Sequence, residues 1–426
     1  MMRGTKSPKR QARAIKIRGE RRHRTLPSLR VPTIGFLLSL LVLLSPDLTL
    51  APLSAVEPAR VPVPIDRLEG PPRRVQLMDD ALPEAGSEPA ALPEAPQVDG
   101  TPFVAAIAAA REAGGAYGVT FAAVRDGQLI WSGAVGRHRD AVTALAADDP
   151  LVIGSVTKTF VAAVILQLAD EGRLGLDDPL GEHLPSLSSV SGKITIRQLL
   201  DHSSGLADVF NDTTRKGLEE HPEHAWTTAE VFKTLHAPWY QPGEGWAYAN
   251  TNYFLLGLII ERVTGASLTD ELQARLLEPL GLAHTRVLTG AADDGGPLAP
   301  AWATIFWGSG AMTSSAADLA HWGDALFDGT VLSESSAGAM IKLNRDDYGL
   351  GAQRIEVPGA IGFGHTGMLN TYTTMLLYLP MQDVTLALLV NRTEVDLGGM
   401  LAARPPSGRS LLELVGVEAT KPKPSP

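Results

Sequence analysis

Residues 154–172 read GSVTKTFVAAVILQLADEG. Residues 157–171 are apolar nearly all round, which is typical of a helix buried inside a large domain. Gly172 provides the end of the helix, where glycine is common. Ser155 and Lys158 stand at its beginning, three residues apart, so their side chains share one helical face. The stretch therefore predicts a core helix that carries a serine and a lysine at its start.

Strands are predicted before and well after this helix. Residues 117–125 and 128–135 alternate between apolar and polar, and Asp126-Gly127 between them is a two-residue turn that favours hairpins. Later the period changes, and strands rich in Thr, Leu, Val and Tyr are predicted at 359–364, 371–379 and 384–390. Helices are predicted at 103–112, 196–202, 228–235, 253–263, 268–277, 319–326 and 409–415.

The order of these elements predicts an α+β fold. Strands open and close the domain, so we expect them to pair into one antiparallel sheet flanked by helices. The block between them is expected to form an inserted, mostly helical subdomain, with a cleft between this block and the sheet. We assign residues 101–416 to this catalytic domain and residues 417–426 to a flexible tail.

Residues 1–55 have the composition of an export segment. Residues 1–30 carry eleven Lys and Arg against one acid, and the apolar run that follows at 34–44 is shorter than the ~20 residues needed to span a bilayer. This order predicts a signal peptide, with an uncleaved membrane anchor or a basic tail before a core helix as alternatives. Residues 56–100 are proline-rich and predict a disordered linker. We therefore expect an exported protein, periplasmic, extracellular or anchored outside the cytoplasm, that meets a membrane only through an uncleaved leader.

Charge and cysteine content exclude several classes of function. Without residues 1–55 the net charge is −19, so a nucleic-acid partner is not expected. The chain contains no Cys, which excludes disulfides, thiolate metal sites and a cysteine nucleophile. His221 and His224 could suggest a metal site, but Pro222 interrupts the helix there and the neighbouring acids indicate a solvated loop. No metal and no cofactor are predicted.

Ser155 is the candidate nucleophile. A residue at a helix start lies near free backbone N–H groups, which favour developing negative charge. Burial disfavours a charged amine, so a buried Lys158 would be a usable base. An N-cap serine followed by a surface lysine is the alternative explanation for this pair taken alone.

Two further segments contain candidate site residues. Tyr248 and Asn250 lie after a turn-rich stretch and before an apolar helix, where loops often supply catalytic groups. A phenol near an ammonium can share its proton, so Tyr248 and Lys158 are paired as acid and base, and Asn250 could donate to a substrate carbonyl. A packing tyrosine and a capping asparagine are the alternatives.

The third segment is His365-Thr366-Gly367, at the end of a predicted strand. Glycines on both sides of His365 and Thr366 let a ligand approach the backbone closely. An imidazole and a hydroxyl together suit an anionic substrate end, although a lone His is more often structural.

Together the three segments resemble the serine β-lactamase and penicillin-binding protein superfamily. The resemblance covers about residues 101–415 and is strongest to the class C β-lactamase branch, in particular to soluble D-alanyl-D-alanine carboxypeptidases, whose third motif also begins with His rather than Lys. Secondary strings that strengthen it lie at 194–205, 278–282, 308–315 and 348–351. The resemblance implies a β-lactamase/transpeptidase-like fold.

The resemblance also implies roles for the residues. Ser155 would form an acyl-enzyme. Lys158 and Tyr248 would act as general base and general acid, and the resemblance leaves open which of the two is the base in each step. The backbone N–H groups of Ser155 and Met368 would form the oxyanion hole. Asn250, His365, Thr366 and Gly367 would bind the substrate, with its terminal carboxylate at Thr366 and His365.

Two positions depart from the carboxypeptidase pattern. An Arg that holds the substrate carboxylate follows soon after the Tyr-Gly-Leu-Gly string in those enzymes, whereas here the stretch is Ala352-Gln353-Arg354. Met368 stands where a small polar residue is common.

We therefore predict an exported serine hydrolase, most simply a D-alanyl-D-alanine carboxypeptidase on peptidoglycan peptides. A β-lactamase or esterase on the same site is the first alternative, and a non-catalytic penicillin- or cell-wall-binding protein is the second. The expected partners are a peptide or β-lactam small molecule, with peptidoglycan as a further candidate.

Overall fold

The computed structural model describes residues 100–185, 192–291, 297–344 and 346–418. The predicted leader at 1–55, nearly all of the linker at 56–100 and most of the tail at 417–426 lie outside these residues. Within the described part, no helix has both the length and the apolar character needed to cross a membrane.

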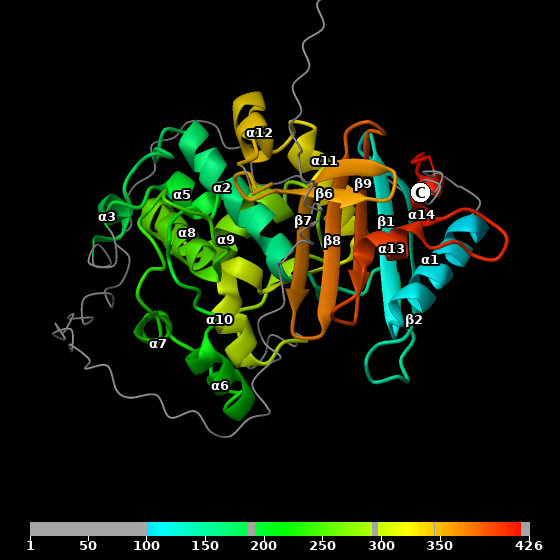
Figure 1. The fold of residues 1–426 in the computed structure, drawn as a ribbon, viewed down its shortest axis with the longest axis horizontal. Helices are drawn as coiled ribbons and strands as arrows, with labels where there is room; N and C mark the ends of the chain where they lie inside the picture. The colour runs from blue at the N-terminus through cyan, green and yellow to red at the C-terminus, as the bar shows by residue number, and fades with distance from the viewer. Residues whose placement is uncertain (1–99, 186–191, 292–296, 345, 419–426) are drawn as a thin grey trace, which may run out of the picture. The chain divides into compact units, whose positions relative to one another are not determined.

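One six-stranded antiparallel sheet forms the first layer of the domain (Figure 1). Its strands follow the order β2-β1-β9-β8-β7-β6, so the first hairpin of the chain pairs with the last strand. The bounds are β1 Gly118–Arg125, β2 Gln128–Gly136, β6 Gln353–Val357, β7 Ala360–Leu369, β8 Tyr372–Leu379 and β9 Val384–Val390. The predicted single sheet, built from both ends of the domain, is confirmed.

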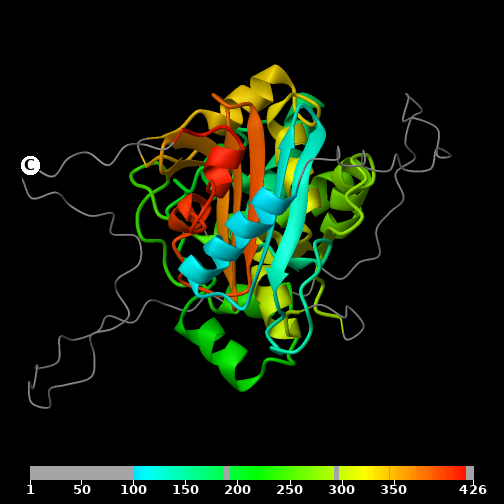
Figure 2. The same cartoon turned by 90° about the vertical axis from the view of Figure 1, so that its right-hand side faces the viewer.

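Helices cover both faces of this sheet. On one face lie α1 (Thr101–Gly114), α13 (Leu397–Ala402) and α14 (Leu411–Leu414), and Figure 2 shows α1 crossing the strands. On the other face α11 (Ala316–Phe327) packs against β1 and β9. Every residue of β9 is buried, as expected for a central strand between two helical layers.

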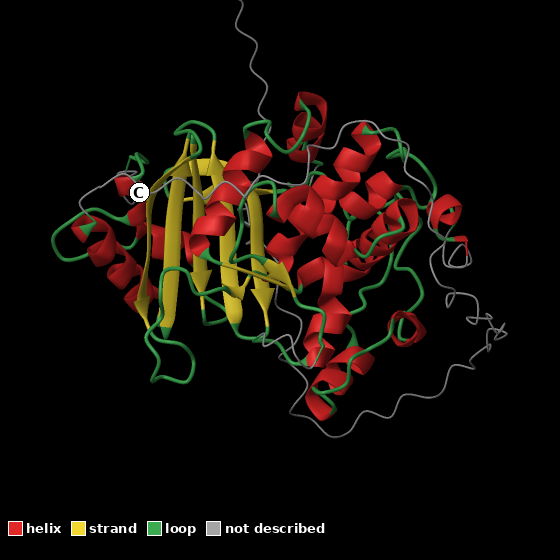
Figure 3. Cartoon of the chain, turned by 180° about the vertical axis from the view of Figure 1, so that it is seen from behind, coloured by secondary structure: helices red, strands yellow, loops and turns green. Residues whose placement is uncertain are grey.

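The helical block between β3 and β6 forms the other half of the domain, as Figure 3 shows from behind. At its centre is α2 (Thr157–Asp170), which is buried along most of its length. Against α2 pack α8 (Asn250–Thr264), α9 (Leu268–Leu272), α10 (Pro300–Gly310) and α12 (Glu334–Ile341). The rest of the block consists of α3 (Leu180–His183), α5 (Ile196–Leu200), α6 (Asp212–Glu220) and α7 (Thr228–Lys233). A small sheet of β3 (Leu151–Val152), β5 (Met312–Ser314) and β4 (Arg286–Val287) adjoins the block.

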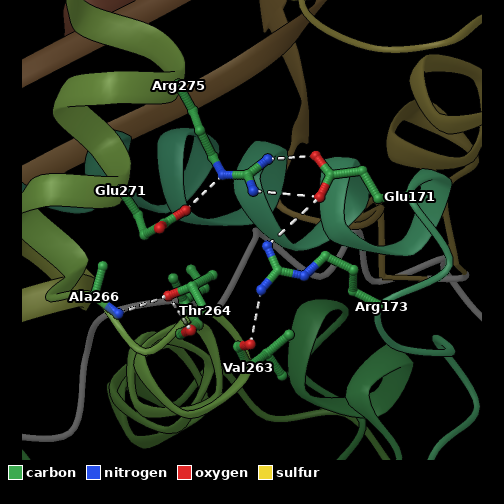
Figure 4. A network of polar contacts seen from close by, with 8 residues as sticks. Glu171, Arg173, Val263, Thr264, Ala266, Glu271 and Arg275 are labelled. Carbon is green, nitrogen blue, oxygen red and sulfur yellow. Dashed lines mark hydrogen bonds and ion pairs between the residues drawn. The ribbon is translucent and has the colours of Figure 1, made fainter. Parts of the chain in front are cut away.

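A network of ion pairs ties the far end of α2 to the rest of the helical block (Figure 4). Arg275 pairs with Glu171 just beyond α2 and with Glu271 on α9. Arg173 donates to the carbonyl of Val263 at 2.8 Å. These groups are partly exposed, and such pairs contribute about 0–1 kcal/mol each. The network fixes the end of α2 that lies about 20 Å from Ser155.

Most predicted elements differ from the structure by up to three residues at an end, and two differ by more. The strand predicted at 359–364 continues to Leu369, because pairing with β8 outweighs the low strand propensity of Gly364 and Gly367. The helix predicted at 268–277 ends as α9 at Leu272 and continues as a π-helical turn, η3 (Gln273–Leu277). The third candidate segment therefore lies inside a strand and not at the end of one.

Candidate active site

Ser155 lies in a short 3₁₀ turn, η1 (Gly154–Val156), which leads from β3 into α2, and β7 passes directly against this turn. A Cβ atom added to Gly154, whose φ is +51°, would lie 2.9 Å from the amide nitrogen of Met368. One added to Gly367 would lie 1.9 Å from the carbonyl oxygen of Ile153 and 3.1 Å from the nitrogen of Ser155. The two glycines therefore let strand and turn approach within backbone contact.

Lys158 is fully buried beside Ser155 and has three polar neighbours. Its Nζ lies 3.1 Å from Ser155 Oγ, 2.8 Å from Asn250 Oδ1 and 2.7 Å from the carbonyl oxygen of Ser309. Asn250 Oδ1 and the Ser309 carbonyl oxygen can only accept hydrogen bonds, so two N–H groups of the amine donate to them. A neutral amine then directs its lone pair at Ser155, whose hydroxyl can donate to it. Burial lowers the pKa of Lys158 to about 7, against an opposing effect of the Asp208 charge.

Asn250, the first residue of α8, links Lys158 to Asp208. Its Nδ2 donates to Asp208 Oδ2 at 3.1 Å and its backbone N–H donates to Asp208 Oδ1 at 3.1 Å. These bonds fix the amide orientation, because Nδ2 must face the carboxylate and Oδ1 must face the amine. Burial raises the pKa of Asp208, while the hydrogen bond from the Phe210 N–H and the charge of Lys158 act to lower it.

Tyr248 lies two residues before α8 and is half-buried with its hydroxyl inside, and Lys158 Nζ is 4.8 Å from its ring centroid. Its hydroxyl makes no hydrogen bond of standard geometry with a described residue, although Ser155 lies near enough to lower the pKa of the phenol. The two hydroxyls are thus adjacent without a hydrogen bond between them. Burial dominates and raises the pKa of Tyr248 above its usual range. At neutral pH Tyr248 is therefore a protonated phenol, and Lys158 is the group able to accept a proton.

His202, just beyond α5, packs directly against Tyr248. The two rings have centroids 4.3 Å apart. The backbone carbonyl of His202 accepts from the N–H of Ala247, and its Nδ1 accepts from the N–H of Ala249 at 3.2 Å. Both neighbours of Tyr248 are thus bonded to one residue, whose own φ is +63°. Burial lowers the pKa of His202 well below its usual value, so the ring is neutral.

His365 is also buried, and both of its ring nitrogens have partners. Nε2 lies 3.0 Å from the Tyr348 hydroxyl and Nδ1 lies 2.6 Å from the carbonyl oxygen of Thr366. Burial and then the charge of Lys158 lower the pKa of His365 to about 3. The structure therefore places a neutral imidazole here, which offers no positive charge to a substrate.

Thr366 faces Gln353 on the neighbouring strand. Its N–H and its Oγ1 each lie 3.1 Å from Gln353 Oε1, and both donate to it. Arg354, the next residue, forms ion pairs with Asp347 at 3.8 Å and Glu356 at 3.6 Å and does not reach Thr366 in this arrangement. The position beside Thr366 is thus occupied by a neutral amide.

The backbone of β7 also presents Met368 to the site. In an antiparallel strand, residues two apart direct their N–H groups to the same edge. The N–H of Thr366 points away from β8 to Gln353, so the N–H of Met368 points to the same free edge, next to the turn of Ser155. The side chain of Met368 is 42% exposed.

The structure thus gathers Ser155, Lys158, Tyr248, Asn250, Thr366, Gly367 and Met368 in one place, with His365 beneath them. The sequence reasoning missed Asp208 and the Ser309 carbonyl, which have no local signature in the sequence, and gave no role to Gln353. The other histidine pair considered, His221 and His224, instead contacts exposed glutamates. In the described ranges no group of three or more His, Cys, Asp or Glu could hold a metal.

The sequence profile of the Beta-lactamase family matches residues 103–404. The chain belongs to the Beta-lactamase family. Within this family it is a class C-like serine hydrolase with the α+β fold of β-lactamases and transpeptidases. Penicillin-binding protein 4 of Amycolatopsis lactamdurans is 30% identical over 312 residues, which cover 64% of this chain and 80% of that protein. Protein flp of Staphylococcus aureus is 37% identical over 137 residues, only 27% of its length.

Several solved structures share the fold. A D-stereospecific amidohydrolase from Streptomyces sp. is 30% identical, with a TM-score of 0.62 over 71% of this chain and 98% of that chain. The octameric penicillin-binding protein homologue from Pyrococcus abyssi is 25% identical, with a TM-score of 0.60 over 75% of this chain and 78% of that chain. D-amino acid amidase from Ochrobactrum anthropi, at 24% identity and a TM-score of 0.61, adds support for the fold alone.

Proposed function

We propose that this Beta-lactamase family hydrolase cleaves amide bonds through an acyl-enzyme on Ser155, in substrates whose acyl part is a D-amino acid. The observation that supports this most directly is the environment of Lys158. Its two acceptor partners and its 3.1 Å contact with Ser155 Oγ suit a neutral amine that removes the serine proton.

In the proposed acylation, Ser155 Oγ bonds to the substrate carbonyl carbon and its proton moves to Lys158. The N–H groups of Ser155 and Met368 stabilise the oxyanion. When the carbon–nitrogen bond breaks, Tyr248 gives its proton to the leaving nitrogen and recovers one from the Lys158 ammonium. Water then attacks the acyl carbon and gives one proton to Lys158. As the bond between the acyl carbon and Ser155 Oγ breaks, the Lys158 ammonium returns this proton to Ser155 Oγ, which restores the serine hydroxyl and the neutral amine.

The relatives support a D-configuration for the acyl part of the substrate. They are compatible with more than one leaving group. One is a D-stereospecific amidohydrolase and another a penicillin-binding protein, and both are 30% identical to this chain. The D-alanyl-D-alanine carboxypeptidase predicted from the sequence, with peptidoglycan peptides as substrate, is the narrower proposal. A D-aminoacyl amide hydrolase is the second candidate, because the partner of Thr366 is the neutral Gln353.

The test is the intact-protein mass after mixing with benzylpenicillin, followed over time beside a Ser155→Ala variant. A stable adduct that requires Ser155 would support a penicillin-binding acyl-enzyme, and a short-lived adduct with hydrolysed penicillin would point to a β-lactamase. A parallel assay of D-alanyl peptides and D-aminoacyl amides measures turnover. If the protein shows no adduct and no turnover that depend on Ser155, the proposed hydrolase is refuted.

We also propose that the protein is exported by residues 1–55, on the basis of their basic and apolar segments. The mass of the protein purified from its natural host tests this. A mass that lacks the leader supports cleavage and export, whereas a full-length protein in the cytoplasmic fraction would contradict the proposal.

A further inference from the structure

We infer that the leaving-group side of the site binds a neutral carboxamide or a continuing peptide, and not a free carboxylate, through Thr366 and Gln353. This inference rests on the proposed hydrolase function and specifies its substrate class. It separates the two candidates above, since a carboxypeptidase must accept a leaving residue with a terminal carboxylate.

The position of the subsite follows from β7. Thr366 and Met368 are two residues apart, so their N–H groups on the free edge lie about 7 Å from each other. If the Met368 N–H binds the scissile carbonyl, one extended residue on the leaving side spans about 3.4 Å of this distance. A hydrogen bond from its terminal group to the protein spans about 3 Å more. The terminal group of a one-residue leaving group therefore meets Thr366 and Gln353.

The hydrogen-bonding capacity of these two residues decides what they can bind. Both donors of Thr366 are directed at Gln353 Oε1, which also fixes the orientation of that amide because the Thr366 N–H can only donate. Among the described residues, no hydrogen bond engages Gln353 Nε2. A substrate therefore meets the NH₂ group of Gln353 as donor and the lone pairs of Thr366 Oγ1 as acceptors.

This donor and acceptor pair matches a carboxamide. The substrate C=O can accept from Gln353 Nε2, and its N–H can donate to Thr366 Oγ1. A carboxylate has only acceptors, so the Thr366 hydroxyl could pair with it only by turning away from Gln353 Oε1, at the cost of one of the two hydrogen bonds to that oxygen.

The charges near the subsite point the same way. His365 is buried with both nitrogens engaged, and the Arg354 guanidinium is directed to Asp347 and Glu356. A carboxylate that leaves water needs a cation or several donors to compensate for its lost hydration. Of the described groups named here beside Thr366, only the Gln353 NH₂ group is left to donate, and it is neutral.

The experiment compares two substrates that differ only in the last group, acyl-D-Ala-D-Ala and acyl-D-Ala-D-Ala-amide, by kcat/KM. We expect the amide to be the better substrate by at least about tenfold, the effect of one hydrogen bond left unmade. Gln353→Arg places a cation beside Thr366 and should reverse the preference towards the acid by on the order of 10²-fold. Arg354→Gln is the matched control and should leave the ratio unchanged.

Three results would overturn the inference. They are a wild-type preference for the acid, a changed ratio in the Arg354→Gln protein, and turnover of neither substrate. Gln353→Leu gives a second check, because it removes the donor without adding charge and should bring the two substrates to within about threefold of each other. Penicillin labelling of Ser155 separates the two proposals: labelled protein that prefers the acid refutes only this inference, whereas unlabelled and inactive protein refutes the hydrolase itself.

Discussion

The charge of Asp208 should set the pH at which Lys158 becomes a base. With a Lys158 pKa of about 7, acylation of the wild-type enzyme should rise with pH through a midpoint near 7, as the amine loses its proton. Asp208→Asn preserves the shape of the side chain and an acceptor for Asn250. It removes the negative charge that favours the ammonium form, so the pKa of Lys158 falls and the midpoint moves to lower pH.

The size of the shift follows from the geometry. The amide of Asn250 separates the two charges by two hydrogen bonds of 2.8 and 3.1 Å. For charges about 7 Å apart at an effective dielectric constant of about 20, the interaction is about 2 kcal/mol, or roughly 1.5 pH units. Burial raises the pKa of Asp208 itself, so part of the charge is lost as the pH falls. We therefore expect a downward shift of about one pH unit.

The assay is the rate of covalent labelling by benzylpenicillin between pH 5 and pH 9, measured by intact mass at early times. At pH 6 the labelling rate of the Asp208→Asn protein should be a larger fraction of its own high-pH plateau rate than is the case for the wild type. Asp212→Asn, which removes an exposed acid on α6, is the control and should leave the midpoint in place. A midpoint that stays near 7 or moves upward in Asp208→Asn would show that Lys158 is not the titrating base.

Four further outcomes test the other parts of the site. Ser155→Ala should abolish both turnover and the penicillin adduct, as read from intact mass. Tyr248→Phe should slow both acylation and hydrolysis of the acyl-enzyme by a factor on the order of 10²–10⁴. The pH midpoint should not move, because the phenol stays protonated over the range assayed. A shifted midpoint in stopped-flow profiles would contradict this. The free energy of unfolding of Lys158→Met, minus that of the wild type, should increase by about 3 kcal/mol when the pH is lowered from 10 to 7. The folded pKa of Lys158, about 7, lies below its unfolded value, so the wild type loses stability as the pH falls and the variant does not. Urea unfolding at both pH values measures this difference, and the same difference at both would argue against a depressed pKa. His202→Ala should lower kcat by about 10- to 100-fold with little change in KM, because Tyr248 loses its packing partner and the Ala249 N–H loses its acceptor; a change in KM alone would indicate a different role.

Much of the fold could be predicted because its signals are local. The turn at Asp126-Gly127 joins β1 and β2 with positive φ at both residues, as its sequence indicates. The strand predicted at 384–390 matches β9, and the apolar residues 157–171 form the buried α2. In each case a period or a turn residue within a few positions determines the element.

The environment of the site could be predicted only in part, because it depends on contacts across the chain. Ser155 and Lys158 are three residues apart, so their pairing is local. Asn250 and Ser309, which complete the surroundings of the Lys158 amine, are 92 and 151 residues away. Ser309 contributes a backbone carbonyl near the end of α10, where helix carbonyls lack partners, and no residue type encodes such a group.

Asp208 should affect acylation in two opposite ways, because it stabilises the ammonium that forms when Lys158 takes the proton of Ser155. In the proposed mechanism the amine of Lys158 is neutral at the start, and its attraction to Asp208 appears only as positive charge develops on it. Asp208 would therefore lower the barrier more than it stabilises the resting site. Loss of this charge makes Lys158 a weaker base. For a shift of about one pH unit and a Brønsted slope near 0.5, the rate plateau at high pH should fall by about threefold. The pH profiles of the wild type and Asp208→Asn should therefore cross, with the variant faster at pH 6 and slower at pH 9. Parallel profiles that differ only in height would mean that Asp208 positions Asn250 without acting through its charge.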